Sequence, residues 1–207
     1  LKYGNLEDYV TVSENAADQA SDSSVCGLKA GDVVQLKDLL YGMMLKSGND
    51  AAIAIAEHIG GSVEGFADMM NQRAQELGCV NTHFVNANGL HSEDHYTTVY
   101  DLYLMFNAAM QHEEFLQMLQ EKEYQASYQA ADGTTVEAVW STTNQFTKGD
   151  VTVPDGVTAV GGKTGTTTAA TGIWTCSPSW TAPPPCSPIG IRRSPSARRP
   201  PASSRRK

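Results

Sequence analysis

The sequence lacks both a long apolar run and a cysteine pattern of the kind that binds metal. No apolar run approaches the roughly 18 residues that a membrane-spanning helix needs. The four cysteines, at positions 26, 79, 176 and 186, form no C-x-x-C pair and match no zinc spacing. We therefore expect neither a metal site nor a cofactor. The chain starts at Leu1 rather than at Met, which we interpret as a start inside a longer protein.

Basic residues are scarce in most of the chain. Residues 1–171 contain only eight Lys or Arg residues against all 23 Asp and Glu residues, a net charge of −15. A surface that binds nucleic acid has to be basic, because it must neutralise phosphates. The acidic body of the chain therefore argues against nucleic acid as a partner.

Residues 172–207 have the opposite composition. They contain seven basic residues and no acid, together with eight of the nine prolines. They show neither a helical nor a strand period, which is typical of disordered segments. We expect a folded domain over residues 1–170 and a disordered tail over residues 171–207. A loss of the reading frame near Ala170 would produce such a tail, and a basic segment that binds nucleic acid is the alternative.

Helical patterns and then strand patterns follow one another along the first 170 residues. Apolar residues recur at helical spacing in the first part, and Thr98 and Asp101 have the spacing of a capping box. After Glu121 the pattern alternates around the turn Asp132-Gly133, which is typical of a hairpin. Helices followed by strands predict an α+β fold, a helical cluster packed on a mostly antiparallel sheet. We expect helices at about residues 36–46, 50–59, 63–77, 98–110 and 115–119, and strands at 10–12, 124–129, 134–140 and 157–163.

The tripeptide Lys163-Thr164-Gly165 ends the last of these predicted strands and is followed by Thr166. The edge of a strand can pair with an extended peptide, and Lys163 places a cation beside it. The hydroxyls of Thr164 and Thr166 can bind a carboxylate, and Gly165 leaves room for a substrate to approach the backbone. Taken alone, this motif is more simply explained as an ordinary strand that ends in a turn.

A second motif, Ser47-Gly48-Asn49, joins two predicted helices. A Ser hydroxyl and an Asn amide two residues apart can relay a proton and hold a substrate carbonyl. Gly and Asn also end helices, so a plain helix cap is the simpler explanation of this motif by itself. If the Asn49 amide and the Lys163 ammonium converge on one cleft, however, the two motifs belong to one site.

The order of the two motifs, with Lys163 about 115 residues after Ser47, is that of the penicillin-recognising serine hydrolases. The flanking sequence closely resembles the D-alanyl-D-alanine carboxypeptidase family over residues 1–170. This resemblance implies the fold shared by β-lactamases and penicillin-binding transpeptidases, incomplete at both ends. It is carried by LLYGMMLKSGNDAA (residues 39–52), NTHFVN (81–86), GLH (89–91), HYTT (95–98) and DL (101–102).

The resemblance implies a serine-type carboxypeptidase that removes the terminal D-alanine from peptidoglycan stem peptides through an acyl-enzyme. In this family the serine of a Ser-x-x-Lys motif attacks the peptide, and the lysine of that motif is the general base. By match to the family, Ser47 relays the proton to the leaving amine and Asn49 contacts the substrate amide. Lys163, Thr164 and Thr166 position the peptide carboxylate, and the backbone N–H of Thr166 contributes to the oxyanion hole.

The resemblance also implies partners and a location. The partners are a stem peptide that ends in D-Ala-D-Ala and, as inhibitors, β-lactam antibiotics. The location is the bacterial cell envelope, either at the outer face of the cytoplasmic membrane or after secretion. We expect the parent protein to be associated with the membrane.

The nucleophilic motif is where the sequence departs from the family. A Ser-x-x-Lys motif should precede Ser47, and we expect it ahead of Leu1. The one match in the chain runs from Ser204 to Lys207, ends the tail, and is interpreted as a coincidence. We therefore expect the chain to be inactive by itself.

Two other functions fit part of the pattern. A class A β-lactamase shares the fold and the Lys-Thr-Gly strand, but that family usually has Asp where Gly48 stands. A non-catalytic module that binds peptidoglycan is the second alternative. His91 and His95 form an H-x-x-x-H pattern without the Glu that directly follows the first His in zinc proteases, so we expect them to be structural.

Overall fold

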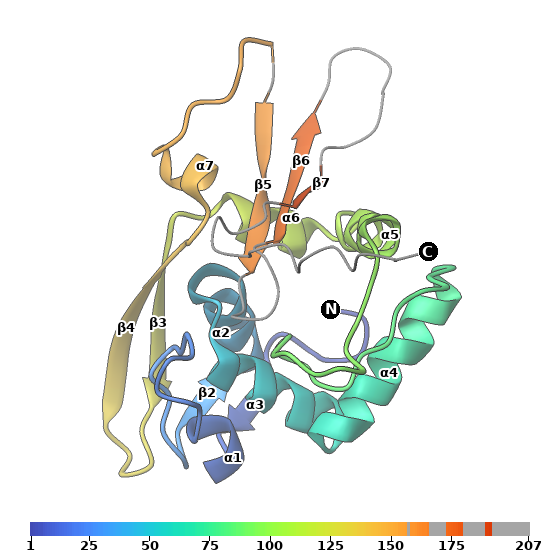
Figure 1. Cartoon of the computed structure of the whole chain (residues 1–207). Coiled ribbons are helices and arrows are strands. Elements are labelled where there is room, and N and C mark those ends of the chain that lie inside the picture. Colours follow the sequence, from blue (N-terminus) through green and yellow to red (C-terminus); the bar gives the residue numbers. More distant parts are fainter. Residues whose placement is uncertain (157, 166–172, 180–188, 192–207) are drawn as a thin grey trace, which may run out of the picture.

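The structure, a computed structural model, describes residues 1–156, 158–165, 173–179 and 189–191. A cluster of helices lies beside a four-stranded sheet, and a three-stranded sheet extends from one end of the cluster next to α6 (Figure 1). The elements are β1 (Tyr9–Thr11), α1 (Glu14–Ala17), β2 (Val33–Gln35), α2 (Leu36–Tyr41), the π-helix η1 (Gly42–Lys46), α3 (Asn49–Gly60), α4 (Val63–Glu76), α5 (Val99–Ala109), α6 (Glu113–Gln120), β3 (Glu123–Gln129), β4 (Thr135–Ser141), α7 (Gln145–Lys148), β5 (Thr158–Gly165), β6 (Ile173–Ser179) and β7 (Ile189–Ile191).

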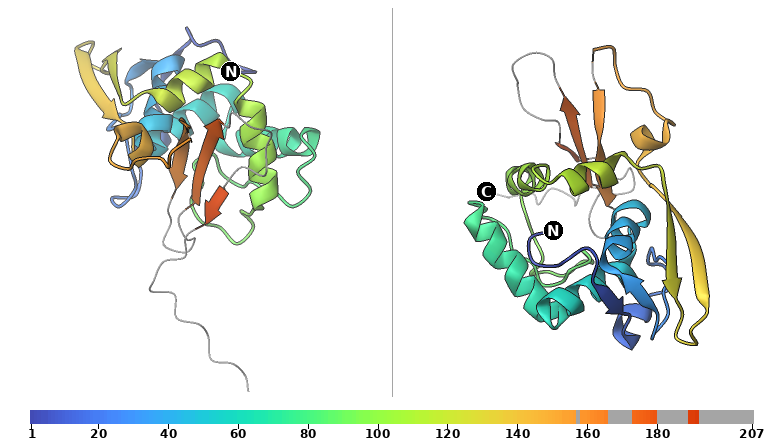
Figure 2. Two further views of the ribbon diagram at one scale, coloured as in Figure 1. Left: turned by 90° about the horizontal axis from the view of Figure 1, so that it is seen from above. Right: turned by 180° about the vertical axis from the view of Figure 1, so that it is seen from behind.

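The two sheets have the orders β1-β2-β3-β4 and β5-β6-β7, and all their strand pairs are antiparallel. Figure 2 shows the two sheets as separate bodies from two further directions. The predicted hairpin joins β3 to β4, and its turn is closed by a hydrogen bond of 2.8 Å from Gly133 N to Ala130 O. Helices packed against antiparallel sheets confirm the α+β class expected from the order of the patterns.

The segment expected to have no regular structure differs from that prediction in two places. Residues 173–179 form β6, which pairs with β5, and residues 189–191 form β7, which pairs with β6. The expectation of no strand there is wrong for these residues, because backbone pairing beside an existing strand does not require alternation of apolar side chains. Residues 180–188 and 192–207 lie outside the described part of the chain, and the domain boundary at 170 stays a prediction.

Helix α3 is the centre of the core, as its apolar composition on all sides predicts. Its first eight residues are buried, and it packs against α1, α2, α4 and β1. The same hydrophobic cluster includes Val12, Val34 and Leu39, together with Trp140 from β4. Because this packing fixes the helix, it also fixes the residues at its N-terminus, where the Ser47-Gly48-Asn49 motif ends.

The helices begin where the sequence indicates. Ser62 caps α4 by accepting a hydrogen bond of 3.0 Å from Gly65 N, and Thr98 caps α5 by accepting one of 3.1 Å from Asp101 N. The Asp101 carboxylate accepts hydrogen bonds from Asn81 N and the Thr82 hydroxyl, which hold its pKa below the usual range. These bonds tie the segment before α5 to the start of that helix.

None of the helices in the described ranges is long and apolar enough to cross a bilayer.

Candidate active site

The two sequence motifs meet at the base of β5. Lys163 donates a hydrogen bond from Nζ to Ser47 Oγ, although 116 positions separate the two residues in the chain. The ammonium also donates to the backbone carbonyl of Thr164 at 2.6 Å. The strand therefore places the Lys163 ammonium beside the hydroxyl of Ser47, which directly follows η1. Figure 1 shows that β5 ends next to the helical cluster near α2.

Burial changes the acidity of the Lys163 side chain. Loss of water around the ammonium lowers the pKa of Lys163 to about 8. Lysine in water has a pKa near 10.4, so a sizeable fraction of Lys163 is neutral in mildly alkaline solution. A lysine of this kind can exchange a proton with a neighbouring hydroxyl more readily than an exposed lysine can.

The turn that carries Ser47 has an unusual backbone. Ser47 has φ 59° and ψ 39°, and among the described residues it alone of the non-glycine residues has a positive φ. The preceding turn is the π-helix η1 rather than a continuation of α2, a feature often found at functional sites. The left-handed residue ends η1, and α3 starts at Asn49 after only Gly48.

A buried carboxylate fixes the residues that follow this turn. Asp50 is 1% exposed, and its side chain accepts hydrogen bonds from three consecutive backbone N–H groups, those of Cys26 (2.9 Å), Gly27 (2.9 Å) and Leu28 (3.1 Å). The preceding loop is thereby attached to the first turn of α3. Asp50 was not among the residues predicted from the sequence, although an acid on a helix that is apolar all round must find buried partners.

Asn49 strengthens the same attachment. Its backbone N–H and its side-chain Nδ2 both donate to the carbonyl of Ser24, at 2.9 Å and 3.0 Å. Only 8% of Asn49 is exposed. The structure therefore gives the Asn49 amide a partner in the loop at residues 24–28, and it gives the Lys163 ammonium a partner in Ser47.

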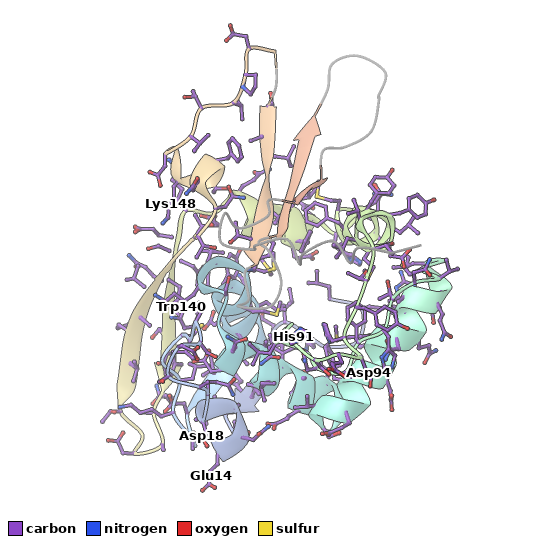
Figure 3. All side chains as sticks on the ribbon, in the orientation of Figure 1. Glu14, Asp18, His91, Asp94, Trp140 and Lys148 are labelled. Atoms are coloured by element: carbon purple, nitrogen blue, oxygen red, sulfur yellow. The ribbon has the colours of Figure 1, made fainter. Side chains whose placement is uncertain are left out.

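The thiol of Cys26 lies directly beneath the turn. A Cβ atom added to Gly48 would lie 2.4 Å from Cys26 Sγ, and one added to Gly42 would lie 2.6 Å from the same atom. Burial raises the pKa of the Cys26 thiol, so this residue stays protonated and does not serve as a nucleophile. Its role is packing, next to Trp140, which Figure 3 labels on β4 beside the helical cluster.

The strand side of the site is held by residues between β4 and α7. Asn144 Nδ2 donates to the Gly162 carbonyl at 3.0 Å, and the hydroxyls of Thr143 and Thr164 lie 2.8 Å apart. Gly161 packs against α6, where an added Cβ would lie 2.5 Å from the carbonyl oxygen of Leu119. Thr143 and Asn144 were not among the residues predicted from the sequence. The N-cap pattern of Asn before a short polar helix was the available signal.

The predicted site residues are therefore distributed as follows. Ser47, Lys163 and Thr164 lie together. Asn49 follows Ser47 by two positions, after Gly48, and is the first residue of α3. Gly165 is exposed at the end of β5. Thr166 and the coincidental match at 204–207 lie outside the described residues.

The two histidines of the H-x-x-x-H pattern lie on the loop before α5. Figure 3 labels His91 on that loop, near Asp94. His95 Nδ1 accepts a hydrogen bond of 3.2 Å from Val85 N, which closes the loop on itself. Among the described residues there is no group of three or more His, Cys, Asp or Glu side chains arranged to hold a metal ion.

Comparisons with known proteins identify the family of the chain. The sequence profile of D-alanyl-D-alanine carboxypeptidases matches residues 4–179. The chain is 41% identical over 108 residues to the D-alanyl-D-alanine carboxypeptidase DacF of Bacillus subtilis, a match that covers 52% of this chain and 27% of DacF. It is 34% identical over 150 residues to the D-alanyl-D-alanine carboxypeptidase of Streptomyces sp. strain K15, covering 68% of this chain and 51% of that protein.

A solved structure shows the same arrangement of elements. The crystal structure of the Streptomyces K15 DD-transpeptidase superposes with a TM-score of 0.76 at 31% identity, covering 86% of this chain and 70% of that one. The chain thus spans about a quarter of the length of DacF and about half that of the curated Streptomyces relative. With the profile match over most of its length, the chain belongs to the D-alanyl-D-alanine carboxypeptidase family.

Proposed function

We propose that this chain supplies the substrate-positioning part of the active site of a serine-type D-Ala-D-Ala carboxypeptidase. Such an enzyme removes the terminal D-alanine from peptidoglycan stem peptides through an acyl-enzyme. The observation that carries the proposal is the hydrogen bond between Lys163 Nζ and Ser47 Oγ, which unites the two motifs in one site.

The strand side would bind the end of the peptide. In the described part of the chain β5 is the edge strand of its sheet, and such an edge can pair with an extended stem peptide. The Lys163 ammonium and the hydroxyls of Thr164 and Thr166 would hold the terminal carboxylate by charge-assisted hydrogen bonds. Gly165, at the exposed end of the strand, leaves space for the D-alanine methyl group.

The turn side would handle the proton and the scissile amide. Ser47 Oγ accepts the hydrogen bond from Lys163, so its own proton is free to point toward a leaving amine. Asn49 would contact the substrate amide after exchanging its present partner, Ser24 O, for the peptide. The lowered pKa of Lys163 supports a relay in which Ser47 passes a proton to the departing D-alanine.

The proposed reaction needs a Ser-x-x-Lys pair in addition to these residues. Its serine attacks the carbonyl of the penultimate D-alanine, the C–N bond breaks, and the terminal D-alanine leaves with the proton. Water then hydrolyses the acyl-enzyme. We expect this pair on a segment ahead of Leu1, and we expect the complete enzyme to act in the cell envelope, associated with the membrane and inhibited by β-lactams.

The test compares the 207-residue chain with a longer gene product that includes a Ser-x-x-Lys segment. The longer protein should release D-alanine from a D-Ala-D-Ala peptide and should form a long-lived adduct with fluorescent penicillin, whereas the chain alone should do neither. Lys163→Met and Ser47→Ala in the longer protein should lower kcat/KM by about 100-fold or more. Lys148→Met, on the exposed end of α7 (Figure 3), is the matched control and should leave kcat/KM unchanged.

Other outcomes distinguish the alternatives. Rapid turnover of penicillin without D-alanine release would identify a β-lactamase. Peptide binding with neither acylation nor D-alanine release would identify a non-catalytic peptidoglycan-binding module.

A further inference from the structure

The segment Thr142–Asn144 lies between the two halves of the site and bonds to both. Thr143 N donates a hydrogen bond of 3.1 Å to the carbonyl of Leu45, two positions before Ser47. The Thr143 hydroxyl lies 2.8 Å from the hydroxyl of Thr164, one position after Lys163. One residue therefore bonds both to η1 and to β5.

Asn144 completes the connection from inside the protein. It is 2% exposed, and Nδ2 donates to the carbonyl of Gly162, one position before Lys163, at 3.0 Å. The other end of the same amide is also used, because Oδ1 accepts hydrogen bonds from Phe146 N (2.9 Å) and Thr147 N (3.2 Å). Two N–H donors on Oδ1 fix the orientation of the amide, so Nδ2 has to point at β5.

The position of β5 relative to η1 needs such a connection. Within the described residues β5 pairs with β6 alone, so no ladder joins the strand to the four-stranded sheet or to η1. A strand held on one side can slide or tilt unless side chains fix it. A shift of 1 Å at β5 would separate the Lys163 ammonium from Ser47 Oγ, since a hydrogen bond weakens steeply beyond about 3.2 Å.

We infer that Asn144, supported by Thr143, is a positioning residue that holds Lys163 against Ser47. Only the effect of this positioning on catalysis rests on the proposed function, because the contacts themselves involve no substrate. Asparagine suits the position because it supplies a donor and a double acceptor from one short side chain. A serine at position 144 would keep an acceptor for the N-cap of α7 but would not reach Gly162 O. Asn144→Ser therefore removes the bond to β5 selectively.

The experiment uses the whole 207-residue chain with 13C-labelled lysine and follows the titration of Lys163 by NMR, with Lys163→Arg for assignment. The wild-type side chain should titrate near its pKa of about 8. In Asn144→Ser the loosened strand admits water to the ammonium, so the pKa of Lys163 should rise by about one unit. Because serine is neutral, no new charge contributes to that shift.

The matched control is Asn71→Ser on α4. The Asn71 side chain likewise donates to and accepts from the backbone, with bonds to Phe84 O and from Phe84 N, both at 2.7 Å. Its helix, α4, lies across the helical cluster from β5 (Figure 1). Its substitution should lower stability in urea by a similar amount while leaving the Lys163 titration within about 0.2 pH units of wild type.

A second variant keeps the test decisive if Asn144→Ser does not fold. Thr143→Val is nearly isosteric and removes only the hydroxyl bond to Thr164, so it should raise the pKa of Lys163 by a smaller amount in the same direction. An unchanged titration in the folded Thr143 or Asn144 variants would overturn the inference, and so would an equal shift in Asn71→Ser. None of these readouts requires catalysis, so failure of the proposed function would not change them.

Discussion

The two halves of the site are fixed in different ways. On the turn side, one buried carboxylate, Asp50, gathers three backbone N–H groups and attaches a loop to the N-terminus of a core helix. On the strand side, β5 is an edge strand held by the side chains of Thr143 and Asn144 and by the packing of Gly161 against α6. The turn is part of the core, whereas the strand is held at a few points.

The two functional groups, the Ser47 hydroxyl and the Lys163 ammonium, are therefore positioned by different kinds of contact. Ser47 lies on a backbone that is determined locally, because the left-handed turn and α3 are consecutive in the chain. Lys163 reaches Ser47 only through contacts between segments that are distant in sequence. Loss of the Asp50 bonds on the turn side should therefore change global stability most, and loss of the Thr143 or Asn144 bonds on the strand side should mainly change the Lys163–Ser47 contact.

The largest effect should come from Asp50→Asn. The amide offers one acceptor oxygen where the carboxylate offers two, so the N–H groups of Cys26, Gly27 and Leu28 cannot all be satisfied. With about 1–3 kcal/mol for each buried group left without a partner, we expect a loss of about 3–4 kcal/mol in the free energy of unfolding. Urea unfolding of the whole chain measures it.

Asp132→Asn is the control for that substitution. Asp132 also accepts two hydrogen bonds, from the backbone N–H and the hydroxyl of Thr134, but it lies exposed in the β3–β4 turn. Water can replace those bonds, so stability should change little. Equal losses in the two variants would contradict the conclusion that burial makes the Asp50 cluster important.

Two glycines allow a direct comparison of the halves. An alanine Cβ at position 161 would meet the backbone carbonyl of Leu119 at 2.5 Å, and φ there is 140°. At position 48 its nearest neighbours would be two side-chain atoms, Cys26 Sγ at 2.4 Å and Asp50 Oδ1 at 2.8 Å. We expect Gly161→Ala to cost about 3 kcal/mol through overpacking plus backbone strain, and Gly48→Ala about 1–2 kcal/mol. A larger loss of unfolding free energy in Gly48→Ala than in Gly161→Ala, measured in the same assay, would contradict this ranking.

The buried ammonium of Lys163 predicts a pH dependence of stability. Its pKa of about 8 in the folded chain lies below the ordinary value of 10.5, so between these pH values the unfolded chain binds more protons. Stability should therefore rise with pH across this window, because the cost of burying the charge is present below pH 8 and disappears above 10.5. Discounted for partial exposure, the contribution is about 2 kcal/mol.

Lys163→Met removes that contribution. The variant should be more stable than wild type by about 2 kcal/mol at pH 7, and the advantage should vanish near pH 10.5. Unfolding of both proteins at several pH values measures the difference, in which the other titrating groups cancel. A difference that stays constant with pH would show that burial of Lys163 has little energetic effect.

Much of the fold was predictable because its signals are local. The helix expected over 50–59 spans Asn49–Gly60, since Ser47-Gly48 and Gly60-Gly61 mark its ends in the sequence. The capping box at Thr98 correctly predicted the start of α5. The resemblance placed Ser47 and Lys163 in one motif set, and the structure brings these two side chains together.

The remaining features depend on contacts that no local pattern contains. The sequence predicted an ordinary helix where the π-helix η1 lies, and Gly42 at its start is close to Cys26 and Trp140, which are distant in sequence. Asn144 gives only the signal of an N-cap, and its bond to β5 cannot be read from that pattern. Strands β6 and β7 were missed because they arise by backbone pairing, β6 with β5 and β7 with β6.

The smallest predicted effect separates backbone strain at Ser47 from its hydrogen bond to Lys163. Ser47→Ala and Ser47→Gly both remove the hydroxyl, so both lose that bond equally. Only glycine relieves the left-handed backbone, worth about 1–2 kcal/mol, and the greater freedom of its unfolded chain offsets part of this gain. Ser47→Gly should therefore unfold at higher urea than Ser47→Ala, by about 0.5–1 kcal/mol. If Ser47→Ala is as stable as Ser47→Gly, or more stable, the turn is not held in a left-handed conformation in solution. The position of Ser47 must then be set by its contact with β5 instead.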